Sequence, residues 1–231
     1  NRNGYDLIVE AAKKCEPLAA NLDDMTPPQL QEWVAKNQAV LATVRRGLAL
    51  PCRFPLNQIG SQEYSAAIGR ARNLALLLVA EGRGFEQAGQ PAQAARSYLE
   101  AIRLGFAITQ GGTMFHHSEG LRHALIGGRA LDALRPKLGA ADCRQAALEI
   151  ARDIRGIPSP ADAIERDRRE FFKGHAVLHA VLRVRRWFPN SSERLTENTF
   201  LGKRAGQLDK LRQLVRDLDQ RAKDLEEGRK Q

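Results

Sequence analysis

The stretch from Leu78 to Phe106, LVAEGRGFEQAGQPAQAARSYLEAIRLGF, predicts two α-helices that fold back on each other around Gly89-Gln90-Pro91. Glycine at position 89 can adopt the left-handed backbone conformation that commonly ends a helix. Pro91 suits the first position of the next helix, because its missing N–H would be unpaired there anyway. The segment therefore predicts a helical hairpin with a tight turn.

Small and large side chains occupy the positions at which these two helices would meet. We expect Gly82 on the first helix to face Ala94 and Ala101 on the second, with Phe85 and Tyr98 filling the gaps between them. If so, a leucine at position 82 would overpack the hairpin.

This spacing resembles the tetratricopeptide (TPR) motif, a helix-turn-helix repeat of about 34 residues. The residues that carry the resemblance are Gly82, Phe85, Gly89, Ala94, Tyr98 and Ala101. One unit matches, and it departs from the motif at Leu78 and Glu81, where Trp and Leu are usual, and near Phe106, where the closing Pro would be. The resemblance implies helical hairpins that bind a protein or peptide segment. Upstream, LALPCRFPLNQ (48–58) resembles an uncharacterised family of bacterial helical proteins, which implies no activity.

The composition is that of a globular protein, with 231 residues, 43% apolar and 27% charged. No apolar run approaches the length of about 20 residues that spans a bilayer. Cys15, Cys52 and Cys143 are scattered, which favours buried thiols over a disulfide framework or a zinc site. The chain opens on Asn1 rather than Met, which is compatible with the removal of an N-terminal signal or anchor; nothing in the sequence indicates a compartment.

Helical periodicity continues through the rest of the chain. We expect helices from Gly4 toward Pro17, from Thr26 as N-cap through Leu48 without a break, and from Ser61 into the hairpin. The first helix of the hairpin would then be longer than in a TPR, and whether it breaks near Arg70 stays open.

Three more helices are expected beyond the hairpin. One begins at Thr113, one spans residues 140–155, and one starts at Ser159-Pro160-Ala161-Asp162 and extends to Trp187-Phe188. The glycines at 120, 127 and 128 weaken the first of these, and close helix packing is one reason for them.

No strand signal interrupts these patterns. The sequence therefore predicts an all-α protein of antiparallel helical hairpins, stacked in a TPR-like or irregular array. We expect residues 1–231 to form a single domain, in which 191–231 are a long C-terminal helix packed as an appendage.

The C-terminal helix carries apolar residues at alternating spacings of three and four, as a and d positions would. They are Leu208, Leu211, Val215, Leu218, Ala222 and Leu225. The pattern is too short to distinguish docking onto the body of the protein from a homo-oligomer through residues 208–225.

Signals for chemistry are weak. His175 and His179 are four residues apart, so they could share a metal with His116 or His117 as a further ligand, but their apolar helix face favours core histidines. There is no GxSxG, HExxH or glycine-rich phosphate loop. We therefore assign no catalytic, cofactor-binding or metal-binding residue.

Charge is more informative than these motifs. Of the net charge of +9, most falls in residues 111–231, which carry 24 Lys and Arg against 17 Asp and Glu. Arg166, Arg169, Lys173 and Arg183 share the polar side of one predicted helix. This side is either a solvated helix face or a site for an anionic partner, whether nucleic acid, acidic lipid or an acidic peptide.

The leading interpretation is a non-enzymatic interaction or scaffold protein, built from TPR-like hairpins and binding a protein or peptide segment. A basic module for nucleic acid or an anionic surface is the alternative, and an enzyme of unknown class is the third.

Overall fold

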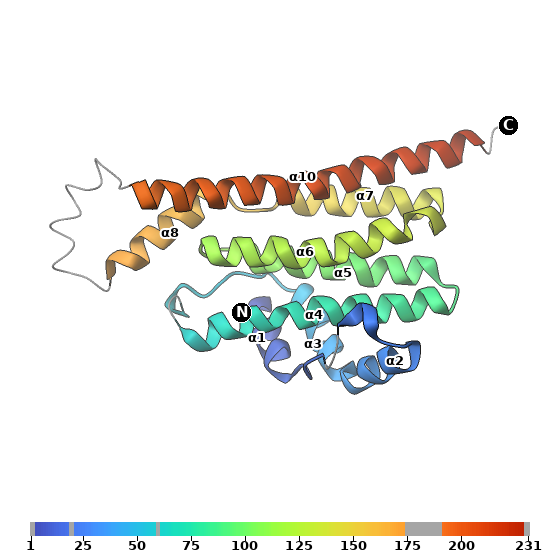
Figure 1. The fold of residues 1–231 in the computed structure, drawn as a ribbon, viewed down its shortest axis with the longest axis horizontal. Helices are drawn as coiled ribbons and strands as arrows, with labels where there is room; N and C mark the ends of the chain where they lie inside the picture. Colours follow the sequence, from blue (N-terminus) through green and yellow to red (C-terminus); the bar gives the residue numbers. More distant parts are fainter. Residues whose placement is uncertain (1–2, 19–20, 59–60, 174–190, 229–231) are drawn as a thin grey trace.

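A computed structural model describes residues 3–18, 21–58, 61–173 and 191–228. Within these ranges the chain forms nine α-helices, three short 3-10 helices and no strand, so the predicted all-α class is confirmed (Figure 1). In chain order they are α1 (Gly4–Lys14), η1 (Leu22–Asp24), α2 (Pro27–Lys36), α3 (Gln38–Leu48), η2 (Leu56–Gln58), α4 (Gln62–Gln87), α5 (Pro91–Thr109), α6 (Met114–Leu134), η3 (Arg135–Lys137), α7 (Ala140–Arg155), α8 (Pro160–Lys173) and α10 (Ser191–Gly228).

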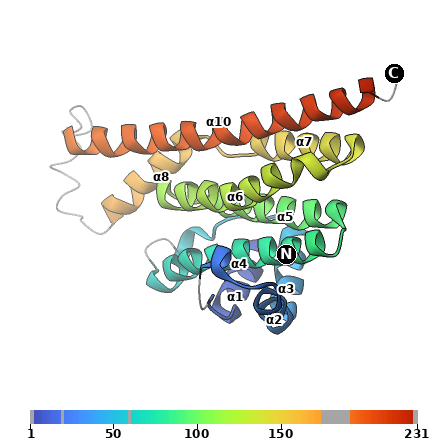
Figure 2. The same ribbon diagram turned by 45° about the vertical axis from the view of Figure 1, so that its right-hand side comes forward.

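The long helices lie side by side in layers (Figures 1 and 2). α7 and α10 form one outer layer, α5 and α6 the next, and α4 the third, while the short helices α1 to α3 cover the far side of α4. The most extensive contacts join α5 to α6, α4 to α5, and α7 to α10. The hairpin therefore lies in the middle of the stack.

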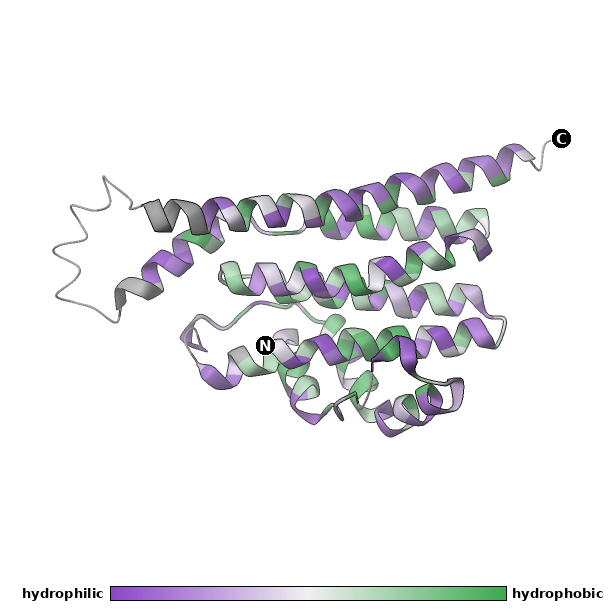
Figure 3. Ribbon diagram, viewed as in Figure 1, coloured by the Kyte–Doolittle hydropathy of each residue, from purple (hydrophilic) through white to green (hydrophobic). Residues whose placement is uncertain are grey.

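Helix α5 is the centre of the core. It buries residues around most of its circumference between Ala94 and Thr109, as expected of a helix with neighbours on several sides. It contacts α3, α4, α6 and α7. Apolar residues concentrate in these inner layers, whereas α8 and α10 are mainly hydrophilic (Figure 3).

The helix boundaries follow the predicted caps at several places. Thr26 and Gln29 form a capping box at the start of α2, and the Ser61 hydroxyl accepts a hydrogen bond from the Tyr64 N–H at the start of α4. α7 spans the predicted residues 140–155. α4 runs for 26 residues without a break near Arg70.

The prediction of one unbroken helix up to Leu48 is wrong, because the chain turns at Asn37. This residue is buried and has φ −103° and ψ 15°. Its side-chain amide donates to the Trp33 carbonyl at 2.9 Å, and its side-chain oxygen accepts from the Glu16 N–H at 3.0 Å. An Asn side chain that bonds to nearby backbone competes with the helix, so two short helices, α2 and α3, replace the long one.

The hairpin turn forms as predicted, but its packing differs in one detail. Gly89 has φ +70° and Pro91 opens α5. A Cβ at Gly82 would lie 2.7 Å from Cδ1 of Tyr98, so the closest neighbour of Gly82 is this ring and not Ala94 or Ala101. The Tyr98 hydroxyl donates to Glu86 at 2.5 Å, which holds the ring across α4.

The C-terminal helix docks onto the body of the protein. Six apolar residues in its described part are buried, namely Phe200, Leu208, Leu211, Leu214, Leu218 and Ala222, and α10 contacts α7 and α6. Val215 and Leu225 from the predicted seam are only partly buried. The structure thus shows the docking alternative, and a homo-oligomer through residues 208–225 would require α10 to leave the body.

Candidate functional site

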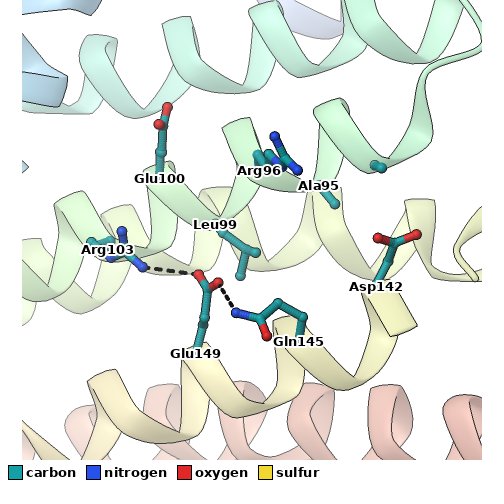
Figure 4. Close-up of a pocket in the computed structure, with 9 residues that line it drawn as sticks. Ala95, Arg96, Leu99, Glu100, Arg103, Asp142, Gln145 and Glu149 are labelled. Atoms are coloured by element: carbon teal, nitrogen blue, oxygen red, sulfur yellow. Dashed lines mark hydrogen bonds and ion pairs between the residues drawn. The ribbon is translucent and has the colours of Figure 1, made fainter. Parts of the chain in front are cut away.

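A groove of about 450 Å³ lies between α5 and α7 (Figure 4). It is lined by Ala92, Ala95, Arg96, Leu99, Glu100, Arg103, Asp142, Gln145 and Glu149. Its volume falls in the range of about 300–1,000 Å³ that small-ligand sites usually have. The groove combines an apolar floor with charged walls.

Charged side chains from the two helices meet across the groove. Arg103 on α5 forms an ion pair with Glu149 on α7 at 3.0 Å and lies 3.6 Å from Asp153. Gln145 donates to the other oxygen of Glu149 at 2.7 Å. These contacts join α5 to α7 at one end of the groove, and the dashed lines in Figure 4 mark those that involve Glu149.

Two charged side chains at the other end of the groove have no partner among the described residues. Arg96 on α5 and Asp142 on α7 make no hydrogen bond or ion pair with any residue in the described ranges. Near them Leu99 forms part of the floor. This end can therefore bind an apolar side chain beside one cationic and one anionic group.

A polar cluster on the other side of α5 positions Glu100. Arg45 on α3 bonds to Glu100 at 2.9 Å and also pairs with Glu81 on α4. Glu81 in turn accepts from the Ser97 hydroxyl at 2.7 Å. The carboxylate that stands where a TPR would usually have Leu is thus held by a guanidinium and a hydroxyl, a partnership that sequence reasoning missed.

None of the six predicted hairpin residues lines the groove. Ala94, Tyr98 and Ala101 are buried, while Phe85 packs partly buried against the core. The groove-lining residues of α5 are their immediate neighbours on the helix. The signal that could have revealed them is the helical spacing of Arg96, Glu100 and Arg103 in an otherwise apolar helix.

The predicted basic face is divided between different environments. Arg166 is half-buried and lines a second cleft, whereas Arg169 is exposed and pairs with Glu165 at 3.2 Å. Lys173 is the last residue of α8. Arg183 lies outside the described residues. Arg168, also on α8, is paired with Glu197 on α10 at 2.7 Å.

The first half of α6 contains three buried histidines, His116, His117 and His123. Thr113 caps this helix together with His116, whose Nδ1 lies 2.8 Å from the Thr113 hydroxyl. The rings of His117 and His123 have no hydrogen-bond partner in the described part of the chain. The pKa of each of the three lies at about 4, mainly because burial disfavours the charged ring. At His117 the nearby Arg204 and Arg166 contribute to the lowering, and at His123 Glu119 opposes it. These histidines are therefore neutral at pH 7.

The carboxylate of Asp167 on α8 completes this region. It accepts a hydrogen bond from the Met114 N–H at 2.6 Å, so it occupies the positive end of the α6 dipole. Burial raises the pKa of Asp167, although the bond from Met114 opposes the rise.

The predicted pair His175 and His179 lies outside the described residues. Within the described ranges no three His, Cys, Asp or Glu side chains gather where a metal ion could bind. Over the same ranges no helix has the length and apolar content that crossing a membrane requires. Comparison with known protein families, curated proteins and solved structures finds no match.

Proposed function

We propose that this chain is a non-enzymatic protein-binding scaffold whose α5–α7 groove receives a segment of another protein. The observation that carries the proposal is the arrangement of α5. This helix is buried along most of its length, yet it presents polar and charged side chains to the groove, and Arg96 there is unpaired.

The groove chemistry indicates what the partner segment would bring. An acidic side chain would pair with Arg96, a basic one with Asp142, and an apolar one would cover Leu99. Opposite charges aligned in this way mainly set the register and specificity of binding. The TPR-like spacing in the hairpin is compatible with such a partner, because repeats of this kind present helical grooves.

Site-specific photocrosslinking in the source cells tests this proposal. A photoreactive amino acid at Gln145 lies in the groove, and one at Lys210, which is exposed on α10, serves as the matched control. We expect a discrete adduct with one protein from position 145 and not from position 210. Arg96→Glu should abolish the adduct without changing the melting temperature, because Arg96 is exposed.

Two results would overturn the proposal. One is the same set of adducts from both positions, and the other is an adduct from position 145 that persists in both Arg96→Glu and Ala92→Trp. The second variant fills the groove from its half-buried rim, so it tests shape where Arg96→Glu tests charge.

A nucleic-acid-binding module remains the runner-up. Of the arginines on α8, Arg168 and Arg169 already pair with carboxylates, which reduces the charge they offer to phosphates.

A further inference from the structure

A second cleft, of about 370 Å³, opens where four separate segments of the chain meet. Arg53 comes from the loop after α3, Gln110 and Gly111 follow α5, Pro158 precedes α8, and Arg166 projects from α8. The cleft is distinct from the α5–α7 groove, since the two share no lining residue.

Each wall of this cleft is fixed by hydrogen bonds. The backbone of Arg53 is held on both sides by the Asn3 side chain, at 3.0 Å from its N–H and 2.6 Å from its carbonyl. The next N–H, of Phe54, donates to the Gln110 carbonyl at 2.8 Å. The base of the Arg53 side chain is therefore positioned before any ligand arrives.

Hydrogen bonds also hold the other segments that line the cleft. Gln110 donates to the Gly156 carbonyl at 3.1 Å and Arg204 donates to the Pro158 carbonyl at 3.3 Å. The Asp167 bond to Met114 anchors α8 next to Arg166. A cleft that is held in this way is pre-organised, which lowers the entropic cost of binding.

Both the backbone conformation at position 111 and the nearby Arg53 side chain favour glycine there. Its φ of +75° lies in the left-handed region that favours glycine. A Cβ at this position would lie 3.1 Å from Cγ of Arg53, so a larger residue would displace that side chain. The backbone thus leaves room for Arg53 beside the cleft.

Two guanidinium groups line this cleft without a partner. Arg166 and the Arg53 side chain make no hydrogen bond or ion pair with any described residue, and Nε of Arg166 is buried. A buried unpaired donor costs free energy unless something binds it. The one carboxylate in the lining is Asp162, which is exposed and is not paired with Arg166, although the two are four residues apart.

We propose that this cleft binds a phosphate group of a small molecule between Arg53 and Arg166. Guanidinium forks match the oxygens of phosphate in bidentate geometry. A doubly charged phosphate is attracted by the two arginines more strongly than a carboxylate is. Asp162 also repels it more strongly, but the two cations outnumber this one carboxylate in the lining. The cleft is also large enough for more than the phosphate, with Pro158 as an apolar part of its wall.

Titration with inorganic phosphate and with pyrophosphate, at an ionic strength held constant with chloride, tests this inference. We expect saturable binding with a dissociation constant on the order of 1 mM or tighter. In NMR spectra of the amide groups, the shifts of Gln110 and Gly111 should move most. Arg53→Gln and Arg166→Gln should each weaken binding at least tenfold, about 1.4 kcal/mol. Asp162→Asn should strengthen it.

Two further variants separate the site from nonspecific attraction. Arg166→Lys keeps the charge but loses the planar fork, so it should also weaken binding. Arg96→Gln, which removes an exposed and unpaired arginine from the other groove, should leave phosphate binding unchanged. Equal melting temperatures of the four arginine variants would show that each is folded.

Several outcomes would overturn the inference. They are the absence of saturable phosphate binding, unchanged binding in both Arg53→Gln and Arg166→Gln, and equally tight binding of malonate. If a phosphoserine peptide bound tenfold tighter than free phosphoserine, the ligand would be a phosphorylated protein segment and not a small molecule. None of these results depends on the α5–α7 groove, so the two proposals fail separately.

Discussion

Gly120 on α6 lies against Gly105 on α5 so closely that a Cβ at position 120 would be 2.5 Å from the Gly105 carbonyl oxygen. The contact is reciprocal, since a Cβ at Gly105 would meet the Gly120 carbonyl oxygen, and it would also lie 2.7 Å from Cα of Ala124. Two turns along α6, a Cβ at Gly127 would lie 2.6 Å from the Tyr98 carbonyl oxygen. The atoms in the way belong to the backbone, so the two helices would have to separate to admit a side chain.

Gly105→Ala is therefore expected to lower the free energy of unfolding by about 1–3 kcal/mol through overpacking. Gly69→Ala on α4 is the matched control, because a Cβ there meets nothing within 4 Å. It should stabilise the protein by up to about 1 kcal/mol through helix propensity. Denaturant unfolding of both variants measures the difference, and equal stabilities would contradict the close approach of α5 and α6.

Removal of Arg45 should destabilise the protein, because Glu81 then loses its cationic partner. Its side chain is 10% exposed and that of Arg45 is 38% exposed, so solvent screens part of the interaction. We expect Arg45→Met to destabilise the protein by about 1–3 kcal/mol, because it leaves a largely buried carboxylate unpaired.

The double variant Arg45→Met/Glu81→Leu should recover part of that loss, since the carboxylate of Glu81 is removed together with its partner, while Glu100 stays without Arg45. The pairwise coupling is obtained from the four unfolding free energies. Strictly additive effects would show that Glu81 does not depend on Arg45.

The buried histidines should make stability depend on pH. His116, His117 and His123 have a pKa near 4 in the folded state, below the value of about 6.5 that they have when unfolded. Above pH 6.5 neither state is protonated at these sites. Between pH 6.5 and 4 the unfolded chain takes up protons that the folded chain excludes, so stability falls as the pH falls.

Each such histidine contributes a slope of up to about 1.4 kcal/mol per pH unit. Asp153 and Asp167 act in the opposite sense, because burial raises their pKa and the folded state takes up their protons first. Unfolding measured from pH 7 to 5 should therefore show a net loss, and His117→Leu should reduce the slope by about one proton. A slope unchanged in that variant would mean that His117 titrates normally in the folded protein.

Docking of α10 predicts a contrast between two leucines on the same helix. Leu218 is fully buried and Leu201 is 39% exposed. Leu218→Ala should cost about 2–5 kcal/mol, whereas Leu201→Ala should change stability by less than about 0.5 kcal/mol. Thermal melts compare the two, and light scattering of both variants reports their molar mass. A fall in mass for Leu218→Ala would favour self-association of the α10 seam over docking.

Binding to duplex DNA should be undetectable at tens of micromolar protein and near-physiological salt. Nonspecific DNA-binding proteins reach dissociation constants of about 10⁻⁴ to 10⁻⁶ M under these conditions. We expect this protein to bind DNA more weakly than that, because 27 acidic residues accompany the 36 basic ones and Arg168 and Arg169 are paired with carboxylates. Fluorescence anisotropy with a labelled duplex measures it. The nucleic-acid alternative would instead be established by two results together. The protein would bind DNA tightly, and Arg166→Gln would reduce the slope of log binding constant against log salt concentration by about one unit.

Local signals determined much of the fold. The Gly89-Gln90-Pro91 turn, the caps at Thr26, Ser61 and Thr113, and the span of α7 all depend on interactions within a few residues. Backbone sterics and nearby hydrogen bonds decide such features, so they can be read in order along the chain. The all-α class follows from the same periodicity.

Contacts between distant segments were decided by the tertiary structure alone. Asn37 breaks a helix because the Glu16 backbone, 21 residues earlier, supplies a partner. Arg166 and Arg169, close neighbours on one helix, separate into a cleft and an exposed ion pair. The groove between α5 and α7 and the cleft at Arg53 each join residues more than 40 positions apart. Helix periodicity specifies which side of a helix is apolar, but it does not specify which helix will cover that side, and both candidate sites depend on that choice.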